Sequence, residues 1–311
     1  MQIGMITDSV GHLDFSEMLA FARRVGLDRL EFACGNWSNA PHLDRAALLR
    51  DAGMRRDFLD RVAGHGLAIS ALNCSGNPLH PGDEGLAQDA VTRETIALAG
   101  LMGVERVVLM SGCPGAPGDA YPNWITVAWP PETRMILQWQ WEEVLIPYWR
   151  RLVAYAAEHG VRKLCIELHG QQMVFNVPTL LRLREAVGEA VGANFDPSHL
   201  MWMGADPLAA IRALGPAIHH VHAKDTRIDP QISGLHGRLE TLPSELWQQR
   251  AWNYVTLGYG HGEAWWAQFT TALAAAGYDD VLSIEHEDFM MSAEEGVEKT
   301  VALLERVVFR R

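Results

Sequence analysis

The sequence has few of the features that mark exported, membrane-bound or nucleic-acid-binding proteins. Its first residues, MQIGMI, lack the basic start and long apolar core of a signal peptide. No apolar run approaches the roughly 20 residues that a membrane helix needs. The 38 Asp and Glu outnumber the 26 Lys and Arg, and the formal charge of -12 argues against a surface for phosphate backbones. These absences predict a cytoplasmic protein that binds neither membranes nor nucleic acid.

Cysteine is also scarce. The four cysteines are Cys34, Cys74, Cys113 and Cys165. They are scattered singly, without the paired spacing of a zinc ribbon or the density of a disulfide-stabilised domain. We therefore expect free thiols.

What the sequence does have is a regular alternation of short apolar runs and amphipathic segments, which is typical of βαβ units on a parallel sheet. The predicted strands lie at residues 2–6, 29–32, 67–72, 105–109, 162–167, 192–196, 218–222 and 281–285. The predicted helices lie at residues 14–26, 44–65, 84–102, 138–160, 178–188, 206–214, 263–277 and 291–307. Asp14 and Ser292 are predicted N-caps, and Pro178 and Pro207 are expected in first turns.

Eight consecutive strand-helix units predict an α/β fold, a single (β/α)₈ barrel domain over residues 1–311. Such barrels carry their active sites on the loops that follow the strands. A doubly wound open sheet is the alternative, but no GxGxxG follows the first strand. Two strand-to-helix loops, at about 111–137 and 226–262, are much longer than usual and predict lids, binding loops or partner contacts.

Tryptophan is concentrated in the loops at this same end of the predicted barrel. Six of the eleven tryptophans lie there: Trp37, Trp124, Trp129, Trp202, Trp247 and Trp252. Either their rings hold the loops against the barrel rim, or they wall a cleft for a substrate bulkier than a free sugar. In the second case Trp124 and Trp129 are expected substrate contacts.

Four of the predicted strands end in a polar side chain. CIELHG carries Glu167, NFDPSHL carries Asp196, IHHVHAKD carries His222 and LSIEHED carries Glu285. Successive side chains of a strand point to opposite faces, and the apolar alternation places all four inside the barrel. His220 shares the inward parity of His222 but lies deeper.

Converging carboxylates repel one another unless a cation neutralises them. Three carboxylates and one imidazole form an oxygen-rich donor set that suits Mn²⁺, with Mg²⁺ and Co²⁺ as alternatives, better than structural zinc. A site of this kind can hold a carbonyl and a neighbouring hydroxyl of a substrate and stabilise an enediolate as a Lewis acid. The sequence therefore predicts a divalent-metal centre.

The same four strand ends resemble those of the xylose isomerase-like TIM-barrel superfamily, which holds sugar isomerases, ketose 3-epimerases and inosose dehydratases. The resemblance covers nearly the whole barrel, whereas the two long insertions depart from the compact epimerases. It implies that Glu167, Asp196, His222 and Glu285 bind the metal. It also implies that Glu167 and Glu285 act as acid and base on either face of the substrate carbon.

Further residues are candidates for substrate contacts. The resemblance implies that His199 and Arg227 hold substrate hydroxyls or the carbonyl oxygen. His169 is a stronger base near neutrality than a metal-bound carboxylate, but it could equally orient a ligand. Asn73 could line the pocket, although an Asx turn is the favoured interpretation. For Lys224 we expect a surface ion pair or a loop hydrogen bond.

The predicted first step is removal of a proton next to a sugar carbonyl. Return of the proton gives an epimerase or isomerase, whereas loss of a β-substituent gives a dehydratase or a lyase that releases an aglycone from a 3-keto-glycoside. The long insertions favour the lyase, and the chain resembles the catalytic subunits of bacterial C-glycoside deglycosidases, which work with a smaller β-rich subunit. Association with such a subunit or with further copies of the chain is expected. The alternatives from other classes are a non-catalytic sugar-binding subunit and a metal-dependent endonuclease, the latter disfavoured by the acidic charge.

Overall fold

Eight parallel strands close into a barrel in the order β1-β10-β7-β6-β5-β4-β3-β2. The computed structural model describes residues 1–310. The barrel strands are β1 (Gln2–Ile6), β2 (Arg29–Ala33), β3 (Ala68–Asn73), β4 (Arg106–Leu109), β5 (Lys163–Glu167), β6 (Val191–Phe195), β7 (Ile218–Ala223) and β10 (Val281–Ile284). The predicted barrel is confirmed, and each predicted strand agrees with the observed one to within one residue at either end.

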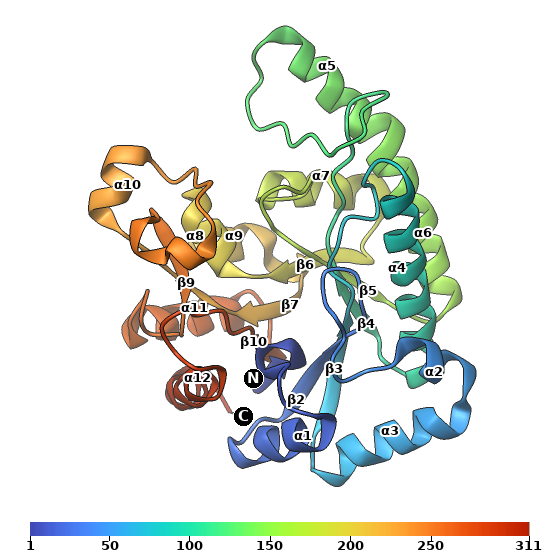
Figure 1. Ribbon diagram of the computed structural model, residues 1–311, viewed down its shortest axis with the longest axis vertical. Helices are drawn as coiled ribbons and strands as arrows, with labels where there is room; N and C mark the ends of the chain where they lie inside the picture. Colours follow the sequence, from blue (N-terminus) through green and yellow to red (C-terminus); the bar gives the residue numbers. More distant parts are fainter. Residues whose placement is uncertain (311) are drawn as a thin grey trace. The chain divides into compact units, whose positions relative to one another are not determined.

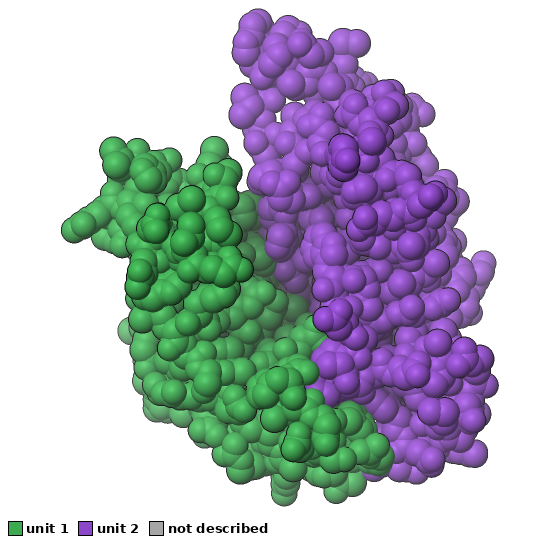
Figure 2. All heavy atoms as spheres, viewed as in Figure 1, with its two compact units in different colours: residues 1–31, 61–70, 195–311 green, residues 32–60, 71–194 purple. Residues whose placement is uncertain are grey.

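The chain forms two compact units, coloured separately in Figure 2. Unit 1 contains residues 1–31, 61–70 and those from 195 onward, and unit 2 contains residues 32–60 and 71–194. In unit 1, β10 pairs with β1 on one side and β7 on the other, which sets Ser283 beside His222. In unit 2, β3 to β6 pair in sequence order, and Ala71, Val108 and Cys165 are buried together.

The helices follow the strands as expected. In unit 1 they are α1 (Phe15–Arg24), α8 (Pro197–Met203), α9 (Pro207–Leu214), α10 (Pro230–His236), α11 (Glu263–Ala275) and α12 (Ala293–Val307). Unit 2 contains α2 (Arg45–Arg50), α4 (Asp83–Met102), α5 (Pro131–Trp139), α6 (Ile146–Glu158) and α7 (Val177–Val187), with α4 beside α6 (Figure 1). The chain of α3 (Ala52–Gly64) is shared by the two units. No helix in the described part of the chain combines the length and apolarity that crossing a bilayer requires.

The end signals account for most helix boundaries. Asp14 and Ser292 accept hydrogen bonds from first-turn backbone N–H groups, so both predicted N-caps are confirmed. The single helix predicted over 44–65 is wrong, because the chain leaves helical geometry at Asp51. Its carboxylate accepts hydrogen bonds from the N–H groups of Gly53 and Met54 and starts a second helix there.

The two insertions contain more regular structure than the sequence predicted. After β4, α5 already begins at Pro131 and continues through a π-helical turn, η2 (Gln140–Leu145), into α6. After β7, β8 (Asp225–Ile228) and β9 (Trp252–Val255) pair antiparallel and enclose α10 and the 3-10 segment η4 (Ser244–Gln249). The second insertion is therefore a folded hairpin and not an irregular loop.

Asp225 fixes the base of this hairpin. Its buried carboxylate accepts hydrogen bonds from the backbone N–H groups of Gly258 (3.2 Å), Gly260 (3.2 Å) and His261 (2.9 Å) and from the indole N–H of Trp266 (3.4 Å). The carboxylate thus supplies acceptors to a glycine-rich turn that has no strand partner. The loop hydrogen bond expected of this region is made here.

Replacing Asp225 by alanine is expected to lower the free energy of unfolding by on the order of 3 kcal/mol, because several buried N–H groups would lose their acceptor. Asp229→Ala is the matched control. Asp229 caps the short helix α10 of the same insertion from a half-buried position, and its loss should cost about 1 kcal/mol. Urea denaturation of both variants measures the difference, and equal losses would contradict the assigned role of Asp225.

Candidate metal centre

His222 lies at the centre of a buried cluster in unit 1. Its Nε2 atom is 3.1 Å from both carboxylate oxygens of Glu31, and its Nδ1 atom is 2.8 Å from Oε2 of Glu285. Oε2 of Glu31 is also 2.7 Å from Nε2 of His220 and accepts a 2.8 Å hydrogen bond from the Ser283 hydroxyl. Carboxylates thus contact both nitrogens of one imidazole.

The charged groups of this cluster shift one another's pKa values toward the ionised forms. Burial alone would lower the pKa of His222, but the carboxylates of Glu31 and Glu285 raise it well above its usual 6.5. Burial likewise opposes ionisation of Glu285, but Lys224 and His222 hold the pKa of that carboxyl below its usual 4.5. His222 is therefore positively charged near neutrality, and a divalent ion bound at Nδ1 would release that proton.

Lys224 supplies a second buried cation. Its Nζ atom lies 3.0 Å from Oε1 of Glu285, 3.0 Å from Oε2 of Glu287 and 4.2 Å from the ring centroid of Tyr254. Only 3% of the side chain is exposed, so the expected surface location is wrong and the ion pair lies inside the protein. The reason is the hairpin, which covers Lys224 with an aromatic ring.

Asp196 and His199 extend the cluster at the start of α8. Oδ1 of Asp196 accepts a 2.8 Å hydrogen bond from the N–H of Ser198, and its Oδ2 atom lies 3.2 Å from Nε2 of His199. The Tyr254 hydroxyl is 2.9 Å from Nδ1 of His199, toward which the Trp202 indole N–H also donates at 3.4 Å. An indole nitrogen can only donate, so Nδ1 is the acceptor and the ring proton lies on Nε2.

The residues present fit a divalent ion. Oδ2 of Asp196 and Oε2 of Glu285 are buried, and within residues 1–310 neither makes a well-aligned hydrogen bond; each faces one imidazole nitrogen, of His199 at 3.2 Å and of His222 at 2.8 Å. A buried carboxylate oxygen without a hydrogen bond is unfavourable, and a bound cation removes that cost. Carboxylate oxygens with one imidazole nitrogen suit Mn²⁺, Mg²⁺ or Co²⁺.

The remaining predicted ligand and base lie in unit 2. Glu167 is the last residue of β5, is buried, and accepts a 3.1 Å hydrogen bond from the side-chain amide of Asn194. Nδ1 of His169 contacts the carbonyl oxygen of Gly170, and the His169 ring lies 6.2 Å from that of Trp37. The assignment of Glu167 as a ligand and of His169 as a base stays a prediction.

The other predicted substrate contacts differ in their surroundings. Asn73 accepts a 2.8 Å hydrogen bond from the N–H of Ser75, which forms the expected Asx turn. Arg227 is exposed on β8. Trp124 packs edge-to-face on Phe175 with ring centroids 5.5 Å apart. Trp129 is 74% exposed, so it does not hold its loop against the barrel.

A comparison with protein families agrees with this geometry. The family model described as "Xylose isomerase-like TIM barrel" matches residues 19–307. The chain belongs to the xylose isomerase-like TIM-barrel family. It is an enzyme of that family with a buried carboxylate and histidine cluster that fits a divalent metal ion.

One curated relative matches nearly the whole chain. "Uncharacterized protein YfiH" of Bacillus subtilis (strain 168) is 48% identical over 311 residues, 99% of each chain. Among solved structures, the IOLI protein with a binding zinc atom has a TM-score of 0.68 at 19% identity and covers 99% of this chain and 98% of its own. D-psicose 3-epimerase with D-tagatose, from Clostridium cellulolyticum, has a TM-score of 0.63 at 13% identity with full coverage of both chains. At these identities the two structures support the fold alone.

Sequence reasoning missed two residues of the site in this xylose isomerase-like enzyme. Glu31 is a single charge within the apolar run LEFA, and the parity rule applied to Leu30 and Phe32 would have placed it inside the barrel. Tyr254 carried no comparable signal, because the four-residue strand β9 lies in an insertion without clear periodicity.

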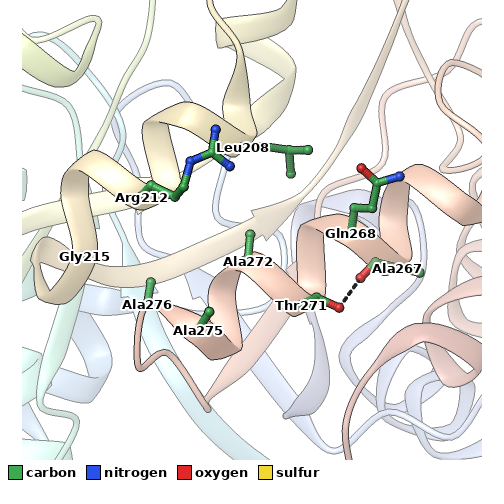
Figure 3. Close-up of a pocket in the computed structure, with 9 residues that line it drawn as sticks. All are labelled: Leu208, Arg212, Gly215, Ala267, Gln268, Thr271, Ala272, Ala275 and Ala276. Atoms are coloured by element: carbon green, nitrogen blue, oxygen red, sulfur yellow. Dashed lines mark hydrogen bonds between the residues drawn. The ribbon is translucent and has the colours of Figure 1, made fainter.

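Two hollows outside the cluster differ in chemistry. A groove of about 590 Å³ between α9 and α11 is lined mostly by small residues, with Arg212 as its one charged side chain (Figure 3), so it offers no acid-base chemistry. A cavity of about 440 Å³ is lined by residues that include Tyr254, Glu287, Phe289 and Met291. Through Tyr254 and Glu287 this second cavity adjoins Lys224 and the candidate metal centre.

Proposed function

We propose that this xylose isomerase-like enzyme uses a divalent ion to remove a proton next to a sugar carbonyl and then eliminates the β-substituent of a 3-keto-glycoside. The observation that carries the proposal is the set of Asp196, His222 and Glu285, of which the first two are buried and the third is half-buried, all held ionised in unit 1. Glu167 is proposed as the fourth ligand, because it ends a barrel strand as the others do and strand ends carry barrel active sites. The ion supplies Lewis-acid polarisation of the substrate carbonyl.

Different residues of the chain are proposed for each proton transfer. Glu167 or Glu285 takes the proton from the carbon next to the carbonyl, and the electron pair of that C–H bond forms the enolate. Collapse of the enolate breaks the bond to the β-substituent, which leaves with its electron pair and takes up a proton. His169 is the alternative base. His199 donates from Nε2 to a substrate oxygen, and Lys224 keeps Glu285 ionised.

A cavity that could hold a leaving group favours elimination. The cavity of about 440 Å³ beside Tyr254 presents the apolar side chains of Phe289 and Met291, and a volume above about 300 Å³ is typical of ligand pockets. The long insertions would accommodate a leaving group, a smaller β-rich subunit or another copy of the chain. The alternative is epimerisation or isomerisation of a free ketose, which the name of the related D-psicose 3-epimerase favours.

Incubation in deuterated buffer tests the reaction. Purified protein with Mn²⁺ is given a 3-keto-glycoside and, separately, free ketoses. We expect release of the aglycone from the glycoside. Deuterium in a ketose without any aglycone release would refute the elimination and favour the epimerase. Metal analysis of the same preparation should find a divalent ion, and full activity after its removal would refute the metal centre.

Replacing Tyr254 by phenylalanine is expected to lower kcat/KM by about fivefold, because one hydrogen bond to His199 is worth about 1 kcal/mol. Tyr259→Phe is the matched control, since Tyr259 is 52% exposed and its hydroxyl contacts Lys299. Steady-state kinetics of the two variants with the glycoside measures the effect. An unchanged Tyr254→Phe enzyme would show that the hairpin does not reach the reaction.

A further inference from the structure

Glu31 carries no role in the proposed chemistry, yet it is fully buried and makes several polar contacts in unit 1. Both of its oxygens lie 3.1 Å from Nε2 of His222. Its Oε2 atom also accepts the Ser283 hydroxyl at 2.8 Å and lies 2.7 Å from Nε2 of His220. A buried carboxylate that contacts a proposed metal ligand through both of its oxygens is expected to have a function.

The contacts distinguish the two ring nitrogens of His222, because each faces a different carboxylate. An ionised carboxylate only accepts hydrogen bonds, so Nε2 of His222 must carry the hydrogen that faces Glu31. A nitrogen that donates a hydrogen bond has no lone pair for a metal ion. Nδ1 instead faces Oε2 of Glu285 at 2.8 Å, and Glu285 is itself a proposed ligand. Nδ1 is therefore the nitrogen that can exchange its proton for an ion shared with that carboxylate.

We propose that Glu31 is a positioning residue that holds His222 in the orientation and tautomer needed to bind the divalent ion through Nδ1. This inference rests on the metal centre of the proposed function. A carboxylate that accepts the second N–H of a ligating histidine fixes the ring and makes the coordinating nitrogen more basic. Loss of such a partner lowers metal affinity by about 10- to 100-fold in other proteins.

The main alternative is that Glu31 itself binds the metal ion. Ligand atoms of Glu31, His220 and His222 all lie within 4.8 Å of one another, so these three could hold an ion themselves. The observed spacings of 2.7 to 3.1 Å between the carboxylate and the imidazole nitrogens are hydrogen-bond distances. Ser283 already donates to the same carboxylate. The arrangement is therefore that of a hydrogen-bond network which supports a ligand.

The coordinating nitrogen can be read directly from the wild-type protein. Protein labelled with ¹⁵N in its histidines is loaded with ¹¹³Cd²⁺ and examined by NMR. The expected spectrum has cadmium coupling to Nδ1 of His222, while Nε2 of the same ring keeps its proton. Coupling to Nε2 would overturn the inference. So would cadmium coupling to His220, because that ion would lie within the Glu31 network.

The variant Glu31→Gln tests the effect on affinity, with Mn²⁺ binding followed by calorimetry. We expect one bound ion, as in the wild type, with an affinity lower by tenfold or more. Ser283→Ala is the matched control, since it removes a hydrogen bond to the same carboxylate and leaves the contact with His222; its affinity should fall less than threefold. Wild-type affinity in Glu31→Gln, or loss of one of two bound ions, would overturn the inference.

A wild type that binds no divalent ion would instead refute the metal centre of the proposed function and, with it, the premise of this inference. The cadmium experiment keeps the inference testable should Glu31→Gln fail to fold.

Discussion

Replacing Glu285 by glutamine is expected to lower turnover about a thousandfold and divalent-ion affinity at least a hundredfold. The change keeps the size of the side chain but removes a charge that Lys224 and His222 hold in place at 3.0 and 2.8 Å. A thousandfold loss corresponds to about 4 kcal/mol, within the several kcal/mol that a metal ion contributes by stabilising developing charge. Neutral glutamine also lacks the basicity to accept the substrate proton.

Glu287→Gln is the matched control for this experiment. Glu287 contacts the same Lys224 nitrogen at the same 3.0 Å, but it is 48% exposed and Glu285 is 21% exposed. Solvent screens an exposed charge, so the control should change Mn²⁺ affinity less than threefold. Calorimetry and turnover of the glycoside are measured on both variants. Full activity of Glu285→Gln with saturating Mn²⁺ would contradict the proposed chemistry, and a loss of ligand affinity in a protein without turnover would favour a sugar-binding subunit.

The barrel could be predicted from the sequence because its signal is local and repeated. A buried parallel strand is mostly apolar, and the segments that form β1 and β7 begin at the predicted residues. Parity then placed His222 and Glu285 on the same side of the barrel wall, and the short contact between them agrees with that placement. Register within a strand fixes which side chains face inward, so the short motifs IHHVHAKD and LSIEHED were sufficient for this part of the site.

The other parts of the site could not be predicted, because they depend on contacts between segments that are distant in sequence. Glu31 and His222 are 191 residues apart, and Tyr254 meets His199 across 55 residues. Nothing in the local pattern around Tyr254 indicates a strand, because β8 and β9 are short and stabilise each other only as a pair. Trp252, predicted in a loop, stacks on Trp202 of α8 with ring centroids 4.9 Å apart. The interpretation that tryptophans hold the loops is therefore correct for this pair.

The burial of Lys224 also depends on contacts that the local sequence does not indicate. It leads to the second prediction with a large expected effect, the replacement of Lys224. The sequence HAKD gave no reason to bury a lysine. The hairpin nevertheless covers it with Tyr254 and leaves its ammonium group between Glu285 and Glu287. Burial alone would lower the pKa of Lys224, but these two carboxylates raise it well above its usual 10.5. Lys224 is thus a fixed positive charge beside a proposed metal ligand.

Replacing Lys224 by methionine is expected to lower the free energy of unfolding by about 3 kcal/mol when EDTA is present. Removing one partner of a buried ion pair costs about 3–5 kcal/mol, and the lower end applies because both carboxylates retain some contact with solvent. Lys299→Met is the matched control, since Lys299 also pairs with a glutamate, at 2.7 Å, and lies over a tyrosine ring, but on the surface. That variant should be nearly as stable as the wild type. Chemical denaturation measures both.

Addition of Mn²⁺ should reverse about half of this loss relative to the wild type. Without Lys224, the Oε1 atom of Glu285 loses its cationic partner, so a divalent ion meets less repulsion and a more available carboxylate. A tenfold gain in affinity would add about 1.4 kcal/mol to the stabilisation that a saturating ion provides. The shift in melting temperature caused by Mn²⁺ should therefore be larger in Lys224→Met than in the wild type or in Lys299→Met. Equal shifts in all three proteins would show that Lys224 and the ion do not act on the same carboxylate, and Glu285 would then be an ion-pair partner of Lys224 and not a metal ligand.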